Sequence, residues 1–158
     1  MKKFSHLDSE GRARMVDVGG KPVQQRIAVA EGCVHCQPQT IAALRAKKLP
    51  KGDVFTVAKV AAIQAAKRVD ELIPLCHTLP LDAVELEFSL RKNMVHIRAE
   101  SRTTARTGVE MEALTAVSVG LLTIYDMCKA VDRGMRIEGV LLLEKKGGKS
   151  GHYLYVAT

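Results

Sequence analysis

Asp126 and Lys129, an acid and a base three positions apart, are the pair with the clearest potential for chemistry. That spacing places both side chains on one face of a helix, which we expect over 109–131. Their neighbours, among them Ile124 and Cys128, are of the types that fill a protein core. Opposite charges in such surroundings are either paired in a cleft or take part in catalysis. The alternative is an ordinary exposed ion pair, which contributes little to stability.

A histidine and two glutamates form a second group of candidates. His77 stands between Pro74 and Pro80, and two prolines stiffen the backbone in a way that suits a site residue. The alternative is a surface loop histidine that makes one backbone hydrogen bond. Glu110 and Glu112 lie at the start of the expected helix, where acids also interact favourably with the helix dipole. The pattern alone leaves both interpretations open.

The segment Gly148-Lys149-Ser150 resembles the end of a phosphate-binding P-loop. That motif needs a glycine five positions before Gly148, where this chain has Leu143, so the P-loop interpretation fails. Glycine-rich backbone beside lysines still suits an anion. A loop that folds over a phosphate and a solvated tail therefore both remain open.

Cys33 and Cys36 have the spacing of half a zinc site. A structural zinc site needs four ligands, and no second Cys/His pair stands at a matching spacing. A redox pair would need its first cysteine at a helix start, which the pattern does not indicate here. Free cysteine mostly behaves as a small apolar residue, so we expect buried or half-buried thiols at a strand end. The sequence thus predicts no metal ligands.

Composition limits the classes of function. The 158 residues carry 24 Lys+Arg against 17 Asp+Glu, a net charge of +7, and 47% are hydrophobic, so we expect one folded domain over 1–158, with flexible ends at 1–10 and 147–158. Scattered positive charge with only 4% aromatic residues favours a small anionic ligand over a polynucleotide. Charges interrupt the most apolar segment, 113–131, and neither a signal peptide nor a disulfide pattern is evident, so we expect a cytoplasmic protein without a membrane partner.

Periodicity predicts strands over 13–18, 26–35, 84–90, 95–99 and 137–143, and helices over 38–47, 54–72 and 109–131. A turn is expected at Gly19-Gly20, and Asp53 has the position of a helix N-cap. On the helix after Asp53, one stripe should face the core, formed by Val54, Val57, Ala58, Ala61, Ala62, Ala65 and Ala66. Strands mixed with two long helices indicate an α+β fold, ferredoxin-like, with helices on one face of an antiparallel sheet.

Several motifs in order resemble the molybdenum cofactor biosynthesis protein C family, the cyclic pyranopterin monophosphate synthases. They are Met-Val-Asp-Val at 15–18, Lys-Gly-Asp at 51–53, Ile-Gln-Ala-Ala-Lys at 63–67, Leu-Ile-Pro-Leu-Cys-His at 72–77, Thr-Gly-Val-Glu-Met-Glu-Ala-Leu-Thr at 107–115, Ile-Tyr-Asp-Met-Cys-Lys-Ala at 124–130 and Gly-Gly-Lys-Ser-Gly at 147–151. The resemblance covers about 4–152. It implies a homohexamer, a trimer of dimers with active sites at dimer interfaces, and conversion of 3′,8-cyclo-7,8-dihydroguanosine 5′-triphosphate to cyclic pyranopterin monophosphate and diphosphate.

The resemblance also implies roles for individual residues. Substrate contacts fall on Leu75, Cys76, His77, Met111 and Glu112, and phosphate contacts on Arg26, Lys145 and Lys149. Catalysis would fall to Asp126, Lys129, Lys51 and His77. Lys146 follows Lys145 directly, which leaves open which of the two reaches the ligand, and the resemblance gives Cys33 and Cys36 no role.

The chemistry of that reaction suits these residue types. A triphosphate needs cations that converge from different segments, and closing a cyclic phosphate needs a deprotonated hydroxyl and a stabilised diphosphate. We expect no cofactor; Mg²⁺ accompanying the triphosphate is compatible with the chemistry but has no support in the sequence. The expected partners are further copies of the chain in the homohexamer and, in transient contact, the enzyme that makes the substrate. The rival is a non-catalytic anion- or RNA-binding module, for which the predicted hairpin offers only Phe88 as a stacking residue.

Overall fold

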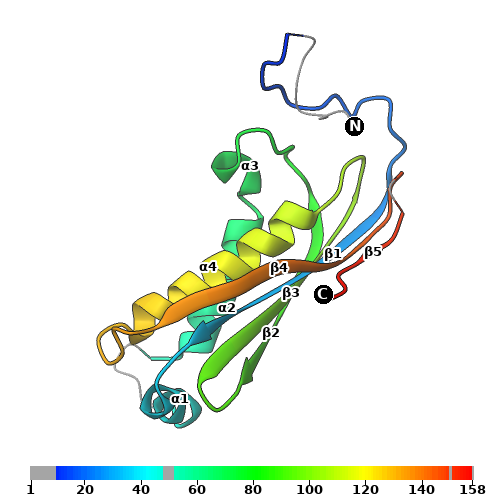
Figure 1. The fold of residues 1–158 in the computed structure, drawn as a ribbon. Helices are drawn as coiled ribbons and strands as arrows, with labels where there is room; N and C mark the ends of the chain where they lie inside the picture. Colours follow the sequence, from blue (N-terminus) through cyan, green and yellow to red (C-terminus); the bar gives the residue numbers. More distant parts are fainter. Residues whose placement is uncertain (1–9, 48–51, 150, 158) are drawn as a thin grey trace.

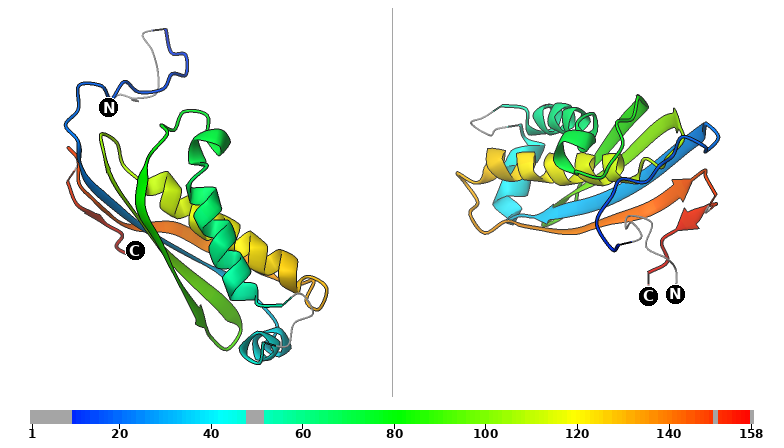
Figure 2. Two further views of the ribbon diagram at one scale, coloured as in Figure 1. Left: turned by 180° about the vertical axis from the view of Figure 1, so that it is seen from behind. Right: turned by 90° about the horizontal axis from the view of Figure 1, so that it is seen from above.

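The computed structural model describes residues 10–47, 52–149 and 151–157. Its elements are β1 (Gln24–His35), α1 (Pro38–Arg45), α2 (Val54–Ala66), α3 (Val69–Leu72), β2 (Leu81–Leu90), β3 (Met94–Ala105), α4 (Glu110–Cys128), β4 (Arg136–Lys146) and β5 (Tyr153–Leu154). The strands form one antiparallel sheet in the order β2-β3-β1-β4-β5. Helices α2 and α4 lie on one face of it (Figures 1 and 2). The predicted ferredoxin-like α+β fold is confirmed, with β5 added at the edge.

The core lies where α4 packs on the sheet and α2 packs on α4. A Cβ on Gly32 of β1 would lie 2.9 Å from side-chain atoms of Leu121 and Val117, so β1 runs directly under α4. A Cβ on Gly120 would meet Ile97 of β3 at 3.1 Å and Ala62 of α2 at 3.6 Å. Small residues therefore set the close spacing between the sheet, α4 and α2.

By length and composition alone, α4 is apolar enough to cross a membrane. The charges of Asp126 and Lys129 therefore do not by themselves exclude a membrane-spanning helix. Half of its most apolar window is buried inside the fold, against the sheet and α2. This burial identifies α4 as the central core helix. Its outer face keeps an exposed Leu122, with 58% of that residue accessible.

Two predicted elements differ from the structure. The segment 13–18 forms no strand beyond an isolated bridge at Ala13. The Val16 carbonyl, which a strand would pair with a neighbouring strand, bonds instead with the His77 ring. The helix predicted to 72 ends at Ala66, and Arg68 has non-helical angles, which let the chain turn and bury Val69 in the separate α3.

Other expectations hold with smaller changes. Asp53 caps α2 by accepting from the Thr56 amide, and Lys21 N donates to Val18 O across the Gly19-Gly20 turn. The predicted hairpin is the β2–β3 pair. Val57 is 45% exposed and does not belong to the buried stripe of α2.

Beyond the end of α4, Asp132 is almost fully buried and serves a structural purpose. Its carboxylate accepts from Gln37 N at 2.7 Å, Thr40 Oγ1 at 3.0 Å and Gly134 N at 3.2 Å. These bonds tie the segment after α4 to the start of α1.

Candidate active site

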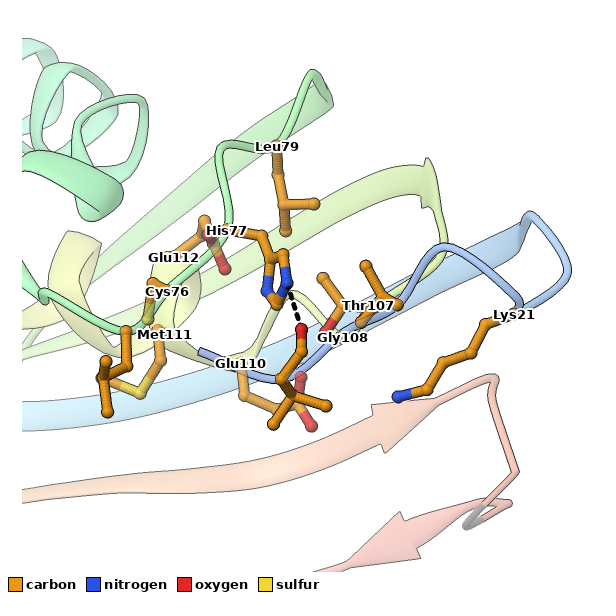
Figure 3. A pocket seen from close by; sticks show the side chains of 12 residues that line it. Lys21, Cys76, His77, Leu79, Thr107, Gly108, Glu110, Met111 and Glu112 are labelled. Atoms are coloured by element: carbon orange, nitrogen blue, oxygen red, sulfur yellow. Dashed lines mark hydrogen bonds between the residues drawn. The ribbon is translucent and has the colours of Figure 1, made fainter. Parts of the chain in front are cut away.

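The segment between the two prolines is fastened to the sheet, and this fixes the position of His77. Thr103 Oγ1 on β3 donates to the Pro80 carbonyl at 2.5 Å, and Thr78 donates to Asp70 of α3. The His77 ring in turn places Nε2 2.8 Å from the Val16 carbonyl (Figure 3). A carbonyl only accepts, so Nε2 carries the hydrogen and Nδ1 is left as an acceptor in the neutral ring.

His77 lies in a cavity of about 370 Å³, called here the His77 cavity. It is lined by Val16, Val18, Lys21, Leu75, Cys76, His77, Leu79, Thr107, Gly108, Glu110, Met111 and Glu112. The structure therefore brings together all five positions for which the resemblance implied substrate contacts. They come from the segment after α3 and from the first turn of α4 (Figure 3).

Glu112 is the buried acid of this cavity. Only 3% of the residue is exposed, and burial, reinforced by the charges of Glu110 and Asp70, raises its pKa to about 7. A carboxyl group with that pKa can give up or take a proton near neutral pH. Burial and the charge of Glu112 also raise the pKa of Cys76, so this residue is a thiol rather than a nucleophilic thiolate.

A second, larger cavity of about 790 Å³ adjoins the first, and we call it the cationic cavity. The two cavities share Lys21, Thr107, Gly108 and Glu110. Its basic lining residues are Lys21, Arg26, Arg106, Lys145 and Lys149. Because the central strands are antiparallel, the start of β1 and the ends of β3 and β4 meet at one end of the sheet. That topology places cations from distant parts of the chain around one space.

Arg26 is the most buried of these cations. It is 8% exposed, and its guanidinium donates to the carbonyls of Ala105 and Arg106 at 3.4 Å each. The backbone of Gly148 lies against it, with φ +87°, and a Cβ there would fall 1.7 Å from Arg26 Nη1. Only glycine fits at this position. The glycine-rich segment after β4 is therefore packed against Arg26 as far as Gly148, and is not a solvated tail there.

Lys145 forms a salt bridge with Glu110 across the cationic cavity, at 2.5 Å. Lys146 points elsewhere and pairs with Glu144 at 2.8 Å. Of the two neighbouring lysines, Lys145 is thus the one that faces the cavity. Lys149 lines the same cavity.

Asp126 and Lys129 lie at the other end of α4. They form an ion pair of 2.6 Å, and each side chain is 56% exposed. The hydrogen bond and the charge of Asp126 raise the pKa of Lys129. Fourteen residues of helix separate Asp126 from Glu112, which is about 21 Å at 1.5 Å per residue. Within one chain, the structure does not bring the pair to the His77 cavity.

An open depression of about 580 Å³ surrounds this end of α4 and is lined by Tyr125, Lys129, Ala130 and Arg133. Lys51, the other lysine predicted to act in catalysis, lies outside the described residues. The described members of the predicted site therefore lie in two separate groups on the chain.

Sequence reasoning missed Lys21 and Arg106 and gave no role to the Val16 carbonyl. Lys21 follows the Gly19-Gly20 turn and reaches the boundary of the two cavities, while Arg106 ends β3. Nothing in the local sequence distinguishes them from other surface cations. Only the sheet topology shows that they converge.

Comparison with known proteins finds related sequences along nearly the whole chain. The model of the MoaC family matches residues 15–148. A cyclic pyranopterin monophosphate synthase from Novosphingobium aromaticivorans is 55% identical over 151 residues, which cover 96% of each of the two chains.

Proposed function

The chain belongs to the MoaC family, and we propose that its two joined cavities convert 3′,8-cyclo-7,8-dihydroguanosine 5′-triphosphate to cyclic pyranopterin monophosphate and diphosphate. This is an early step of molybdenum cofactor biosynthesis. The observation that carries the assignment to this site is the junction of the cavities. The cationic cavity, lined by five basic residues, adjoins the His77 cavity. The latter holds Glu112, whose pKa is about 7, and His77, whose ring is oriented by the Val16 carbonyl.

The shape of the substrate matches that division. Its triphosphate requires several charge-assisted hydrogen bonds, which Arg26, Lys145 and Lys149 can donate from the cationic cavity. The ring system then extends into the His77 cavity, whose apolar lining includes Leu75 and Met111. Glu110 occupies the shared wall and holds Lys145 in place before phosphate binds.

The chemistry needs proton transfers at two places. In the ring rearrangement, protons move at the purine-derived ring, where Glu112 and the Nδ1 atom of His77 can donate or accept them. In the cyclisation, a sugar hydroxyl loses its proton, its oxygen bonds to the α-phosphorus, and the bond to diphosphate breaks. Lysines and arginines around the phosphates stabilise the charge that develops on the leaving diphosphate. No cofactor is needed to balance either step.

We further propose that the Asp126–Lys129 pair acts in the cavity of a second subunit, within a homohexamer built from dimers. Two observations support this arrangement: the roughly 21 Å of helix between the pair and Glu112, and an apolar outer surface on the helices. Val57 and Val60 on α2, and Leu122 on α4, are 45%, 51% and 58% exposed. A single chain leaves this surface in water, and a symmetric partner would cover it.

A nucleic-acid partner has little support. Phe88 of the hairpin packs against Phe55 of α2, with ring centroids 5.4 Å apart, and so does not form a stacking platform. We propose a cytoplasmic protein that acts on a small molecule, with the labile substrate delivered in transient contact with the enzyme that makes it.

The experiment is to incubate the purified chain with the cyclic triphosphate and measure diphosphate and cyclic pyranopterin monophosphate together. We expect the two products in equal amounts. GTP is the matched control ligand, since it carries the same triphosphate but lacks the C3′–C8 bond; it should compete for binding and release no diphosphate. Binding of the cyclic triphosphate without release of diphosphate would identify a non-catalytic binding module instead.

A further inference from the structure

Cys33 and His35 lie together on the outer face of the sheet. They are two residues apart on β1, so their side chains point to the same side of the sheet. Gly32, which directly precedes Cys33, faces the opposite side, toward α4. Cys33 and His35 therefore face away from the helices. Cys36, by contrast, is buried with 8% of the residue exposed, so the Cys-x-x-Cys spacing does not describe a pair of ligands.

The neighbouring strand adds a carboxylate to this pair. Glu138 of β4 is the register partner of Cys33, which puts its side chain on the same outer face. The donor atoms of Cys33, His35 and Glu138 all lie within 4.8 Å of one another. His35 Nε2 is 2.6 Å from Glu138 Oε1, and Cys33 Sγ is 3.6 Å from the Glu138 carbonyl oxygen.

A further side chain orients the carboxylate. Arg136 Nε donates to Glu138 Oε2 at 2.8 Å, which leaves Oε1 turned toward His35. Such an outer contact is the usual way in which a ligating carboxylate is held. His96, which lies opposite Cys33 on β3, pairs instead with Glu31 at 2.9 Å and stands outside the group.

We propose that Cys33, His35 and Glu138 bind a divalent transition-metal ion of the zinc type. Thiolate, imidazole and carboxylate are the three ligand classes that Zn²⁺ takes in proteins, and water would complete a tetrahedron. Around such an ion, ligand atoms stand roughly 3.3–3.6 Å apart, so the group needs side-chain rotation and no movement of the strands. On binding, the Cys33 thiol gives its proton to solvent, and the hydrogen bond between His35 and Glu138 is exchanged for two bonds to the metal.

The site is distinct from the cavities of the proposed function. Nine residues of strand separate His35 from Arg26, about 30 Å at 3.3 Å per residue. The ion would join β1 to β4 where their register shifts, between Glu31 and Cys33. It would thus fasten an irregular part of the ladder and stabilise the folded state by binding it selectively.

The test is a Co²⁺ titration of the untagged full-length protein, followed by optical absorption. We expect saturable binding, with the thiolate-to-cobalt charge-transfer band and the strong visible bands of a tetrahedral site. Cys33→Ser should abolish the charge-transfer band, and His35→Ala should weaken Co²⁺ binding by at least about tenfold. His152→Ala is the matched control, because His152 pairs with Glu144 away from the group; it should bind Co²⁺ as the wild type does.

Thermal unfolding gives a readout that needs no cobalt spectrum. Stoichiometric Zn²⁺ should raise the melting temperature of the wild type and of His152→Ala, and should leave that of Cys33→Ser unchanged. The proposal is overturned if Co²⁺ produces no charge-transfer band in the wild type, or if Cys33→Ser keeps the wild-type spectrum and the Zn²⁺-induced stabilisation. Turnover does not enter either measurement, so the proposed synthase function can fail or hold independently.

Discussion

The two ends of α4 carry carboxylates in opposite situations. Glu112, in the first turn, is buried beside other acids, and its pKa rises to about 7. Asp126, in the last turn, is half exposed and paired with Lys129, whose pKa it raises through a hydrogen bond and its charge. One acid can therefore exchange a proton near neutrality, while the other favours the charged form of a neighbouring lysine. The same helix thus supplies two chemical functions, because burial differs along its length.

The two ends also differ in what surrounds them. The first turn of α4 adjoins two cavities. Residues of the strands, the loop before β2 and the N-terminal segment line them, among them His77 and five cations. The last turn faces an open depression and lies on the helix layer that exposes Leu122. The proposed site shared between subunits would join the cavities at one end of α4 to the exposed ion pair at the other.

Neutralising Asp126 should have the largest effect on turnover. Asp126→Asn keeps the shape and removes the charge that orients Lys129 and favours its charged form, so we expect kcat to fall by roughly 10³-fold with little change in KM. Because Asp126 raises the pKa of Lys129, the alkaline limb of the kcat profile should also move to lower pH. Steady-state and single-turnover kinetics across pH measure both effects.

Lys129→Ala is the companion variant for that prediction. Thermal melts should match those of the wild type, since an exposed charge contributes little to folding. A loss of activity that only follows a loss of folded protein would remove the pair from the reaction.

Glu112→Gln should have the next largest effect and should separate function from stability. We expect kcat to fall by roughly 10²-fold, the usual contribution of a general acid or base. The folded-state pKa of Glu112 lies above its ordinary value of 4.5, so its burial costs stability at pH above about 7, and the cost disappears as the pH falls below 4.5. The variant should therefore be more stable than the wild type at pH 8, by about 3 kcal/mol. Denaturant unfolding at pH 8 and pH 4 tests this, and a less stable variant at pH 8 would contradict the raised pKa.

Removing a phosphate contact should have the smallest effect on the chemical step. Lys145→Ala should raise KM by roughly tenfold, because a charge-assisted hydrogen bond is lost in ground state and transition state alike. Lys146→Ala is the matched control, since Lys146 pairs with Glu144 outside the cavity, and its KM should stay at the wild-type value. High salt should reproduce the Lys145 effect. A large fall in kcat for Lys145→Ala with unchanged KM would reverse the roles assigned to the two ends of α4.

Much of the fold could be predicted from the sequence because its signals are local. Alternation in 84–90 and 95–99, the Asp53 cap and the apolar 109–131 segment each reflect a short-range requirement of strand, cap or core helix. The segment 13–18 was wrongly predicted as a strand, since an alternating pattern does not show whether a partner strand is available. Its contact with His77, through the Val16 carbonyl, is long-range and joins residues 61 positions apart.

The site could be predicted in part and for a different reason. Motif resemblance named His77, Glu112 and the Arg26 and Lys145 positions, and the structure gathers these in two joined cavities. Spacing could not reveal Lys21 or Arg106, because their proximity depends on how antiparallel strands end together. The Cys33–Glu138 pairing is hidden in the same way, since only the β1–β4 register brings those residues together.

Subunit complementation is the most direct test of the central claim, that the cavities of one chain work with the Asp126–Lys129 pair of another. Glu112→Gln and Lys129→Ala chains, each nearly inactive alone, are co-expressed and purified through two different tags. In mixed assemblies about one quarter of the sites combine an intact cavity with an intact pair, so activity should return to about 25% of wild type. Chains that carry both substitutions serve as the control and should stay inactive. If the mixed assemblies show no more activity than the two variants separately, each site lies within one chain and the account is wrong.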